Sequence, residues 1–181
     1  MKMNLLKTVV ISAVLFLQFG CGNKEQDQSS KGLYFFTNMD QYYGFVDPNR
    51  IKKVNFARSG EYVSYSDSGE QSSLTFYRLV SEISDKKLYK AEVSGWLYSE
   101  LQNPECFFIY SADSAYTKVY DFQSTSVKND LSSVKQWTKV SATFYIPDTV
   151  PPYAQLRIYM GNQSHKTVYI DDFAIQFFEK K

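Results

Sequence analysis

The sequence predicts an all-β protein, an antiparallel β-sandwich or barrel that follows a short export segment. Beyond residue 32, apolar and polar residues alternate with a period of two, which is the period of a half-buried strand. Turn-forming residues separate these short alternating runs. No apolar stripe of helical period is longer than one turn, so the helices that a parallel α/β fold requires between its strands are missing.

The first residues of the chain are typical of a secretory signal peptide. Lys2 and Lys7 precede an apolar run over residues 9–19, and small residues follow it. A basic start, a short apolar stretch and a small residue at the cleavage site are the parts of such a signal. A transmembrane helix needs about 20 apolar residues, and this run is too short. We therefore expect residues 1–20 to direct export and to be removed.

Cys21 is the residue that we expect to carry lipid. Together with the four residues before it, Leu-Gln-Phe-Gly, it resembles the lipobox of bacterial lipoproteins. The resemblance implies a diacylglyceryl group on the Cys21 sulfur and an acylated amino terminus, with fatty acids such as palmitate inserted into a membrane. The alternative is an ordinary signal peptide with a cysteine that follows it by chance. The lipobox interpretation predicts that the protein is bound to a membrane through a lipid anchor.

Residues 21–32 are expected to be the lipidated cysteine and a flexible tether. Apart from the cysteine, this range contains no apolar side chain that could be buried, so it cannot form a packed structure. Lys24, Glu25 and Asp27 resemble the charged export tags of surface-exposed lipoproteins in Bacteroidetes. We expect a protein of the cell envelope, anchored to the outer membrane on its periplasmic or its exposed side. Residues 33–181 are predicted to form a single domain.

The charge balance and the cysteine count exclude some partners and some cross-links. Removal of the signal peptide takes away two lysines and leaves 161 residues with 18 basic and 19 acidic side chains. Nucleic-acid binding depends on clustered lysine and arginine, so we expect no nucleic-acid partner. With Cys21 lipidated, Cys106 has no partner for an intramolecular disulfide. Its apolar neighbours predict a small buried hydrophobic residue and not a reactive thiol.

Three ranges, 89–98, 137–146 and 154–160, show the strand alternation most clearly. Each predicted strand has one dry side and one wet side. We expect Trp137 to be a core residue that caps the sandwich, and the polar range 124–133 to be a connection. In the first range, the predicted dry side holds Tyr89, Ala91, Val93 and Leu97, and the predicted wet side holds Lys90, Glu92, Ser94, Trp96 and Tyr98.

Four stretches, taken in their order and spacing, resemble one family. They are Ala-Arg-Ser-Gly-Glu-Tyr at 57–62, the strand with Val-Ser-Gly-Trp at 89–98, Trp-Thr-Lys-Val leading to Ile-Pro at 137–147, and Val-Tyr-Ile-Asp-Asp-Phe-Ala-Ile at 168–175. They resemble galactose-binding-like jelly-roll domains, and within that group the carbohydrate-binding modules of glycan-degrading enzymes. The resemblance spans about residues 33–178. It implies a single antiparallel jelly-roll β-sandwich that binds glycans without catalysis.

The resemblance also implies a structural calcium ion. Such an ion takes six to eight oxygen ligands from carboxylates and backbone carbonyls. Asp171 or Asp172 matches the family's carboxylate on the last strand, and the carbonyls at Ser59 and Gly60 match its turn ligands. Asp40 is the candidate for the early carboxylate, although the residues before it depart from the family's usual Asn-x-x-Phe-Glu. The alternative is an Asp pair that hydrogen-bonds a turn and binds no metal.

Aromatic and polar residues on two strands are the candidates for sugar binding. The chain has 15 Tyr, 14 Phe and 2 Trp, and flat rings cover the C–H faces of a pyranose. Glu92, Trp96 and Tyr98 share the wet side of one predicted strand, and Arg157 and Tyr159 share that of another. If both sides belong to the same concave sheet, they form a platform with convergent polar groups. The alternative for the tryptophan is a role in the core.

We expect no catalytic activity. His165 is the single histidine of the chain and lies in a predicted turn, so neither a zinc cage nor a Cys–His pair can form. Neighbouring residues of a regular strand face opposite ways, so Asp171 and Asp172 cannot act as a pair of catalytic carboxylates. The predicted partner is an oligosaccharide or a polysaccharide. Two alternatives stay open: a structural or assembly lipoprotein that contacts an envelope protein, and, less favoured, an accessory subunit of a glycoside hydrolase.

Overall fold

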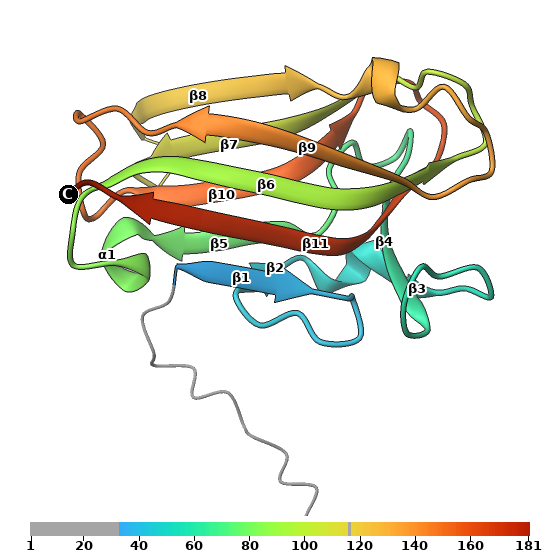
Figure 1. Ribbon diagram of the computed structural model, residues 1–181, viewed down its shortest axis with the longest axis horizontal. Coiled ribbons are helices and arrows are strands. Elements are labelled where there is room, and N and C mark those ends of the chain that lie inside the picture. The colour runs from blue at the N-terminus through green and yellow to red at the C-terminus, as the bar shows by residue number, and fades with distance from the viewer. Residues whose placement is uncertain (1–32, 116) are drawn as a thin grey trace, which may run out of the picture.

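The computed structural model describes residues 33–115 and 117–181, which form a sandwich of two antiparallel sheets (Figure 1). The predicted signal peptide, Cys21 and the tether lie outside the described residues. Within the described residues, no helix has the length and apolar character that spanning a membrane requires. The prediction of an all-β, antiparallel sandwich is confirmed.

Sheet A consists of β1 (Tyr34–Thr37), β3 (Ile51–Lys53), β4 (Tyr62–Ser66), β6 (Leu88–Ser99), β9 (Thr138–Tyr145) and β11 (Val168–Glu179). The strand order is β3-β4-β11-β6-β9. Strand β4 pairs with residues 168–170 of β11, and β1 pairs with residues 173–176. Two short strands therefore share one long edge of β11.

Sheet B consists of β2 (Phe45–Val46), β5 (Thr75–Leu79), β7 (Cys106–Asp113), β8 (Val119–Ser126) and β10 (Gln155–Asn162). Its strand order is β2-β5-β10-β7-β8. Consecutive strands lie in different sheets, except for β3 followed by β4 in sheet A and β7 followed by β8 in sheet B. Three short helices lie in the connections: η1 (Pro48–Arg50), α1 (Val80–Ile83) and η2 (Lys128–Asp130).

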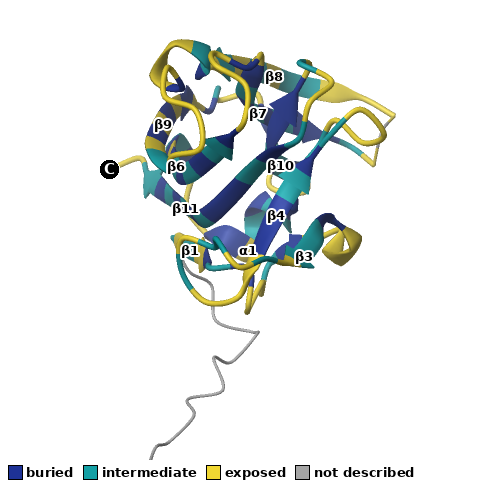
Figure 2. Cartoon of the chain, turned by 90° about the vertical axis from the view of Figure 1, so that its right-hand side faces the viewer, coloured by how far each residue is buried: buried dark blue, intermediate teal, exposed yellow. Residues whose placement is uncertain are grey.

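The two sheets pack through their inner faces, and the dry side predicted for β6 lies there (Figure 2). Ala91, Val93 and Leu97 of β6 are buried, but Tyr89 is only half-buried and Leu88 is buried instead, so the prediction was wrong at Tyr89, where the pairing with β11 is irregular. Rings from opposite sheets meet in the core, where Phe108 of β7 stacks on Phe173 of β11 with centroids 5.9 Å apart. Such pairs contribute about 0.5–1.5 kcal/mol beyond the area they bury. The outer faces are left to polar residues and to the aromatic residues that the core does not use.

Cys106 begins β7 and is buried in this core, as predicted. Burial raises the pKa of its thiol to about 12. The thiol therefore stays protonated at physiological pH and acts as a small hydrophobic side chain.

The regular alternation breaks at a β-bulge in β11. Val168 and Ile170 face the core before the bulge, and Phe173 and Ile175 face it afterwards, so the inward parity changes. Asp172 carries the left-handed conformation, with φ 48°. An inserted residue of this kind bends a strand and redirects its side chains. An uninterrupted period of two along β11 was the wrong expectation, and so was a connection beginning at residue 124, because β8 continues to Ser126.

Candidate functional site

The five residues proposed for sugar binding do not form one platform. Glu92, Trp96 and Tyr98 project from β6 on the outer face of sheet A. Arg157 and Tyr159 project from β10 on the outer face of sheet B. Since the sheets pack through their inner faces, these two sets lie on opposite sides of the sandwich. Alternation along a strand predicts which side is wet, but it does not reveal to which sheet the strand belongs.

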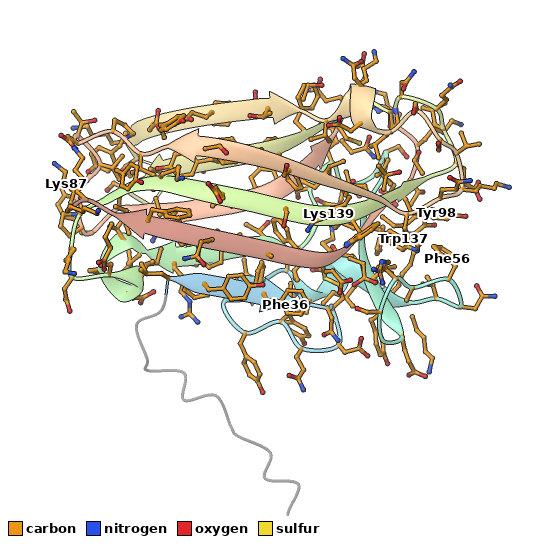
Figure 3. The ribbon with its side chains drawn as sticks, in the orientation of Figure 1. Phe36, Phe56, Lys87, Tyr98, Trp137 and Lys139 are labelled. Atoms are coloured by element: carbon orange, nitrogen blue, oxygen red, sulfur yellow. The ribbon has the colours of Figure 1, made fainter. Side chains whose placement is uncertain are left out.

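A loop covers the outer face of sheet A around Tyr98. This loop, residues 54–61 between β3 and β4, is called the strap, and the bond from the Val54 N–H to the Glu61 carbonyl (3.0 Å) closes its base. The ring of Phe56 stacks on Tyr98 with centroids 4.8 Å apart and planes at 26°. The ring of Trp137 packs against Tyr98 with centroids 5.4 Å apart, and its indole N–H donates to the Phe56 carbonyl at 2.8 Å (Figure 3). The ring face of Tyr98 is therefore occupied by protein.

The strap also covers Trp96, through Arg58. The guanidinium carbon lies 4.3 Å from the centroid of the indole ring, in the geometry of a cation–π pair. Trp96 is half-buried and points outward, so it is not a core residue, yet its face is not open. Trp137 is likewise half-buried in the outer aromatic cluster, so the prediction that it plugs the core was wrong. A sugar could reach these rings only by displacing the strap.

Two neighbouring carboxylates hold the strap in place. Asp171 Oδ2 accepts the backbone N–H of Arg58 (2.8 Å) and of Ser59 (3.0 Å), and Asp171 Oδ1 accepts the N–H of Asp172 (2.8 Å). Asp172 Oδ1 accepts the Ser59 hydroxyl at 2.6 Å. The bulge lets both carboxylates reach the same turn, so the expectation that they face opposite ways was wrong. Burial raises the pKa of Asp171 to about 6, although its N–H partners act to lower it.

Asp40 and Gly60 complete the attachment of the strap. Gly60 has φ 61°, a conformation that favours glycine, and a Cβ atom there would collide with the Asp40 carboxylate. Asp40 Oδ2 accepts the Glu61 N–H at 3.2 Å. The residues proposed as calcium ligands, namely Asp40, Ser59, Gly60, Asp171 and Asp172, thus gather at one turn.

The contacts at this turn fit a hydrogen-bonded clamp better than a calcium cage. The turn presents N–H groups to the carboxylates, whereas calcium requires oxygens. Across residues 33–115 and 117–181, no group of three or more His, Cys, Asp or Glu side chains is placed to hold a metal ion. Calcium binding stays a prediction, which the clamp geometry does not favour.

A groove of about 310 Å³ lies on the outer face of sheet B. It runs across β2, β5 and β10, where cross-strand pairing sets Tyr77 beside Arg157. Tyr77 and Tyr159 supply rings, and Asp47, Ser72 and Thr75 supply polar groups at its margin. The lining residues are Val46, Asp47, Ser72, Thr75, Tyr77, Arg157 and Tyr159.

Arg157 is fixed in the groove by its neighbours. Its Nη1 and Nη2 donate to the two carboxylate oxygens of Asp113 at 2.8 and 3.3 Å, and Nη2 also donates to Gln155 Oε1 at 3.3 Å. The side chains of Arg157 and Asp113 are 14% and 5% exposed, so the pair is shielded from water. The guanidinium carbon lies 5.6 Å from the centroid of the Tyr77 ring. The planar guanidinium is thus held over the Tyr77 ring before any ligand arrives.

The groove combines two residues that the sequence suggested with several that it did not. Arg157 and Tyr159 were candidates, whereas Tyr77, Asp47 and Asp113 were missed. Asp113 pairs with a residue 44 positions away, and no sequence spacing signals such a contact. Burial raises the pKa of Tyr159, so its hydroxyl remains a neutral hydrogen-bonding group at physiological pH.

Glu92, the remaining candidate, lies apart from both sets of rings. It borders a shallow hollow of about 280 Å³ on sheet A that is also lined by Tyr34, Ser94 and Gln176. The Lys90 ammonium donates to Glu92 Oε1 at 2.8 Å. His165 lies in an exposed turn with φ 56°, as the sequence predicts.

Comparison with known proteins identifies the fold. No protein-family model matches the sequence, and no curated protein matches it. The chain is similar to the CBM22-1 xylan-binding domain of Paenibacillus barcinonensis Xyn10C, with 10% identity and a TM-score of 0.54 over 81% of this chain and 95% of that one. It is also similar to the CBM22-1–CBM22-2 tandem domain of the same protein, with 11% identity and a TM-score of 0.54 over 84% of this chain and 48% of that one. The chain therefore has the galactose-binding-like jelly-roll fold of these two structures.

Proposed function

We propose that this protein is a non-catalytic glycan-binding lipoprotein of the cell envelope, and that the groove on sheet B holds the sugar. The observation that carries this proposal is the arrangement of Tyr77, Tyr159 and Arg157 on one solvent-facing surface. The rings offer apolar faces to the C–H groups of a pyranose. The guanidinium and Asp47 offer a donor and an acceptor for its hydroxyls.

Preorganisation supports this choice of surface over the strap region. The bond pair to Asp113 fixes Arg157, so binding does not have to order that side chain. On sheet A, by contrast, Phe56 and Arg58 already occupy the ring faces that a sugar would use. A ligand there would have to replace protein contacts before forming its own.

The fold suggests which glycans to test first. One structure with this fold is described as a xylan-binding domain, so xylan-derived oligosaccharides belong among the first probes. The groove volume of about 310 Å³ suits a short stretch of a glycan chain. Low identity leaves the choice of sugar to experiment.

The proposed function places the domain at a membrane and gives it no catalytic step. Lipid on Cys21 and the tether at 21–32 would hold the domain near the outer membrane, where it would retain a glycan and not cleave it. The single histidine lies in an exposed turn and the buried thiol of Cys106 is protonated, so neither is placed as a nucleophile or base. Calcium at the strap is not needed for this function.

The test is a glycan array followed by titration calorimetry on the best ligand. Tyr77→Ala and Tyr159→Ala should each weaken binding by about tenfold, because each removes a ring from the groove. Tyr153→Ala is the matched control, since Tyr153 is exposed and does not line the groove. Binding that survives both groove variants would move the site elsewhere. Failure to bind any glycan would leave the assembly role as the better explanation.

A further inference from the structure

Exposed aromatic residues gather on the first strand of the domain and on the loop that follows it. We call Tyr34, Phe36, Tyr42 and Tyr43 the aromatic patch; they are 58%, 48%, 40% and 56% exposed. Twelve large apolar residues are exposed in the described part of the chain, and these four together with Val46 fall within residues 34–46. A local concentration of exposed apolar side chains marks an interaction surface.

Strand β1 turns half of this patch outward by alternation. The ring of Phe35 points into the core, with its centroid 4.7 Å from that of Phe76 and 6.0 Å from that of Phe177. Tyr34 and Phe36 therefore point to the outside. Figures 1 and 2 place β1 and its loop at one edge of the sandwich, and Phe36 lies on that edge in Figure 3. Packing does not require aromatic residues at these outward positions, and polar ones would be solvated there.

The segment that carries the aromatic patch contains few charges. Asp40 is the single Asp, Glu, Lys or Arg among residues 33–46, and its carboxylate is directed to the Glu61 N–H of the strap. Tyrosine concentrates at the interface between a bilayer and water, where its ring is apolar and its hydroxyl is wet. A segment of tyrosine and phenylalanine fits this zone, because its exposed rings carry no charge. Glu92, which borders the hollow beside Tyr34, is paired with the Lys90 ammonium at 2.8 Å.

We propose that the aromatic patch docks on the phospholipid bilayer that holds the lipid of Cys21. This inference rests on the lipid anchor of the proposed function and adds a second membrane contact. Leu33 follows Cys21 by 12 residues. An extended chain of that length spans about 40 Å, and a flexible one averages about 20 Å. The patch begins at the next residue, Tyr34, so this surface is nearest to the anchor along the chain.

The tether makes weak docking sufficient. A short flexible link gives an effective concentration on the order of millimolar, so a surface with millimolar affinity is docked for about half of the time. Acyl chains hold a protein more firmly when a second membrane signal accompanies them. The aromatic patch supplies that signal without basic residues.

The test anchors the chain from Cys21 to Lys181 by chemistry and does not depend on lipidation in the cell. The Cys21 thiol is coupled to a maleimide lipid in vesicles of phosphatidylethanolamine and phosphatidylglycerol. Cys106 does not react because it is buried. Hydroxyl-radical footprinting then measures the oxidation rate of each aromatic residue. The reference is the same chain at the same concentration, with Cys21 blocked by a small maleimide.

We expect oxidation of the patch to fall about twofold on vesicles, because the surface is docked for about half of the time. Tyr145 and Tyr153, which are 67% and 64% exposed, should oxidise equally in both forms. Equal oxidation of the patch in both forms would overturn the proposal. So would protection in the blocked chain that rises with its concentration, because a second copy would then cover the patch.

A pair of variants separates docking from other effects of the anchor. The triple variant Tyr34→Ser, Phe36→Ser, Tyr43→Ser should return Tyr42 on vesicles to its oxidation rate in the blocked chain. The matched control, Phe122→Ser, Tyr145→Ser, Tyr153→Ser, removes three comparably exposed aromatic residues elsewhere and should leave Tyr42 protected. Glycan binding is measured on the same vesicles. If the wild-type patch is not protected on vesicles while glycan binding is intact, the docking inference alone is refuted. If the wild-type patch is protected but no glycan binds, the groove proposal alone is refuted.

Discussion

The outer face of sheet A under the strap and the outer face of sheet B carry the same kinds of side chain in different arrangements. Each has aromatic rings and an arginine over one of them: the guanidinium carbon of Arg58 lies 4.3 Å from the Trp96 centroid, and that of Arg157 lies 5.6 Å from the Tyr77 centroid. Arg58 belongs to a loop, the strap. Arg157 belongs to a strand and is held within the surface by Asp113.

The difference teaches that the residues of a face do not by themselves make it a binding site. On sheet A the strap packs on the rings, and these contacts contribute to stability. On sheet B the arrangement leaves a groove that the rings of Tyr77 and Tyr159 line. Whether a loop covers the face decides whether its rings stabilise the fold or line an open groove. The following experiments test this difference between the two sheets.

The largest expected effect is on stability, at the centre of the covered face. Tyr98→Ala removes a ring that contacts Phe56, Trp137 and Tyr169, so the free energy of unfolding should fall by about 3 kcal/mol. Urea denaturation measures this change, and glycan affinity should stay as in the wild type. Tyr145→Ala, at an exposed position, should change stability by less than about 0.5 kcal/mol. A stable Tyr98→Ala protein with weakened glycan binding would reverse the assignment of the two faces.

The second effect is a pH dependence of the covered face. Burial raises the pKa of Asp171 to about 6, above its ordinary value of 3.8, so the folded protein binds this proton more tightly than the unfolded chain. Asp171 therefore contributes stability that is fully present below about pH 4 and is lost as the pH rises through about 6. The loss should be about 2–3 kcal/mol at most.

Comparison of wild type with Asp171→Asn isolates this contribution, because Asp148 and Glu179, whose pKa values are lowered by lysines and a serine, act in the opposite direction in both proteins. The difference in unfolding free energy should slope between pH 4 and pH 6 and be flat above that range. A difference that is flat throughout would show that the Asp171 carboxylate has its ordinary affinity for protons.

A smaller effect should appear on the open face. Arg157→Lys keeps the charge but loses the planar fork that bonds both oxygens of Asp113. We expect glycan affinity to fall by about tenfold, or about 1.4 kcal/mol, and the unfolding free energy to fall by only about 1 kcal/mol. Calorimetry and urea denaturation on the same preparation measure the two quantities. Unchanged affinity would mean that the fixed guanidinium is not part of the site.

The smallest effect concerns calcium. The strap offers N–H groups where the ion needs oxygens, so added Ca²⁺ or a chelator should change the free energy of unfolding by less than about 0.5 kcal/mol. Differential scanning calorimetry with Mg²⁺ as the control ion measures this. A rise in melting temperature that is specific to Ca²⁺ would establish the metal site and revise the description of the clamp.

Much of the fold could be predicted because a sheet with one dry face leaves a period of two in the sequence. Strand β9 follows that rule along its whole length, and β6 and β10 follow it from Ala91 to Ser99 and from Gln155 to Met160. The strap and the Asp pair could be placed near one another through resemblance to a family. The bulge in β11 could not be predicted, since the left-handed Asp172 leaves no trace in the alternation.

The site was harder to predict than the fold, for two physical reasons. Assignment of β6 and β10 to different sheets depends on how strands pair over long distances, and local patterns do not record it. Whether a ring face is open to a ligand depends on which residues cover it, and the covering residues can be distant in sequence. Phe56 and Arg58 lie about 40 residues before the rings that they cover. Residues such as Asp113 enter the site only through tertiary contact.

The shared edge of β11 bears on how such a protein would resist mechanical load. Tension between a retained polymer and an anchor at Cys21 would enter the fold at β1, which pairs with β11 over four residues. Phe35 inserts next to that entry point and locks the short strand to Phe76 and Phe177. Strand β1, where the force would enter, is therefore held by ring contacts to both sheets. The pairing of β11 with β4 and β6 would be loaded only after β1 had detached.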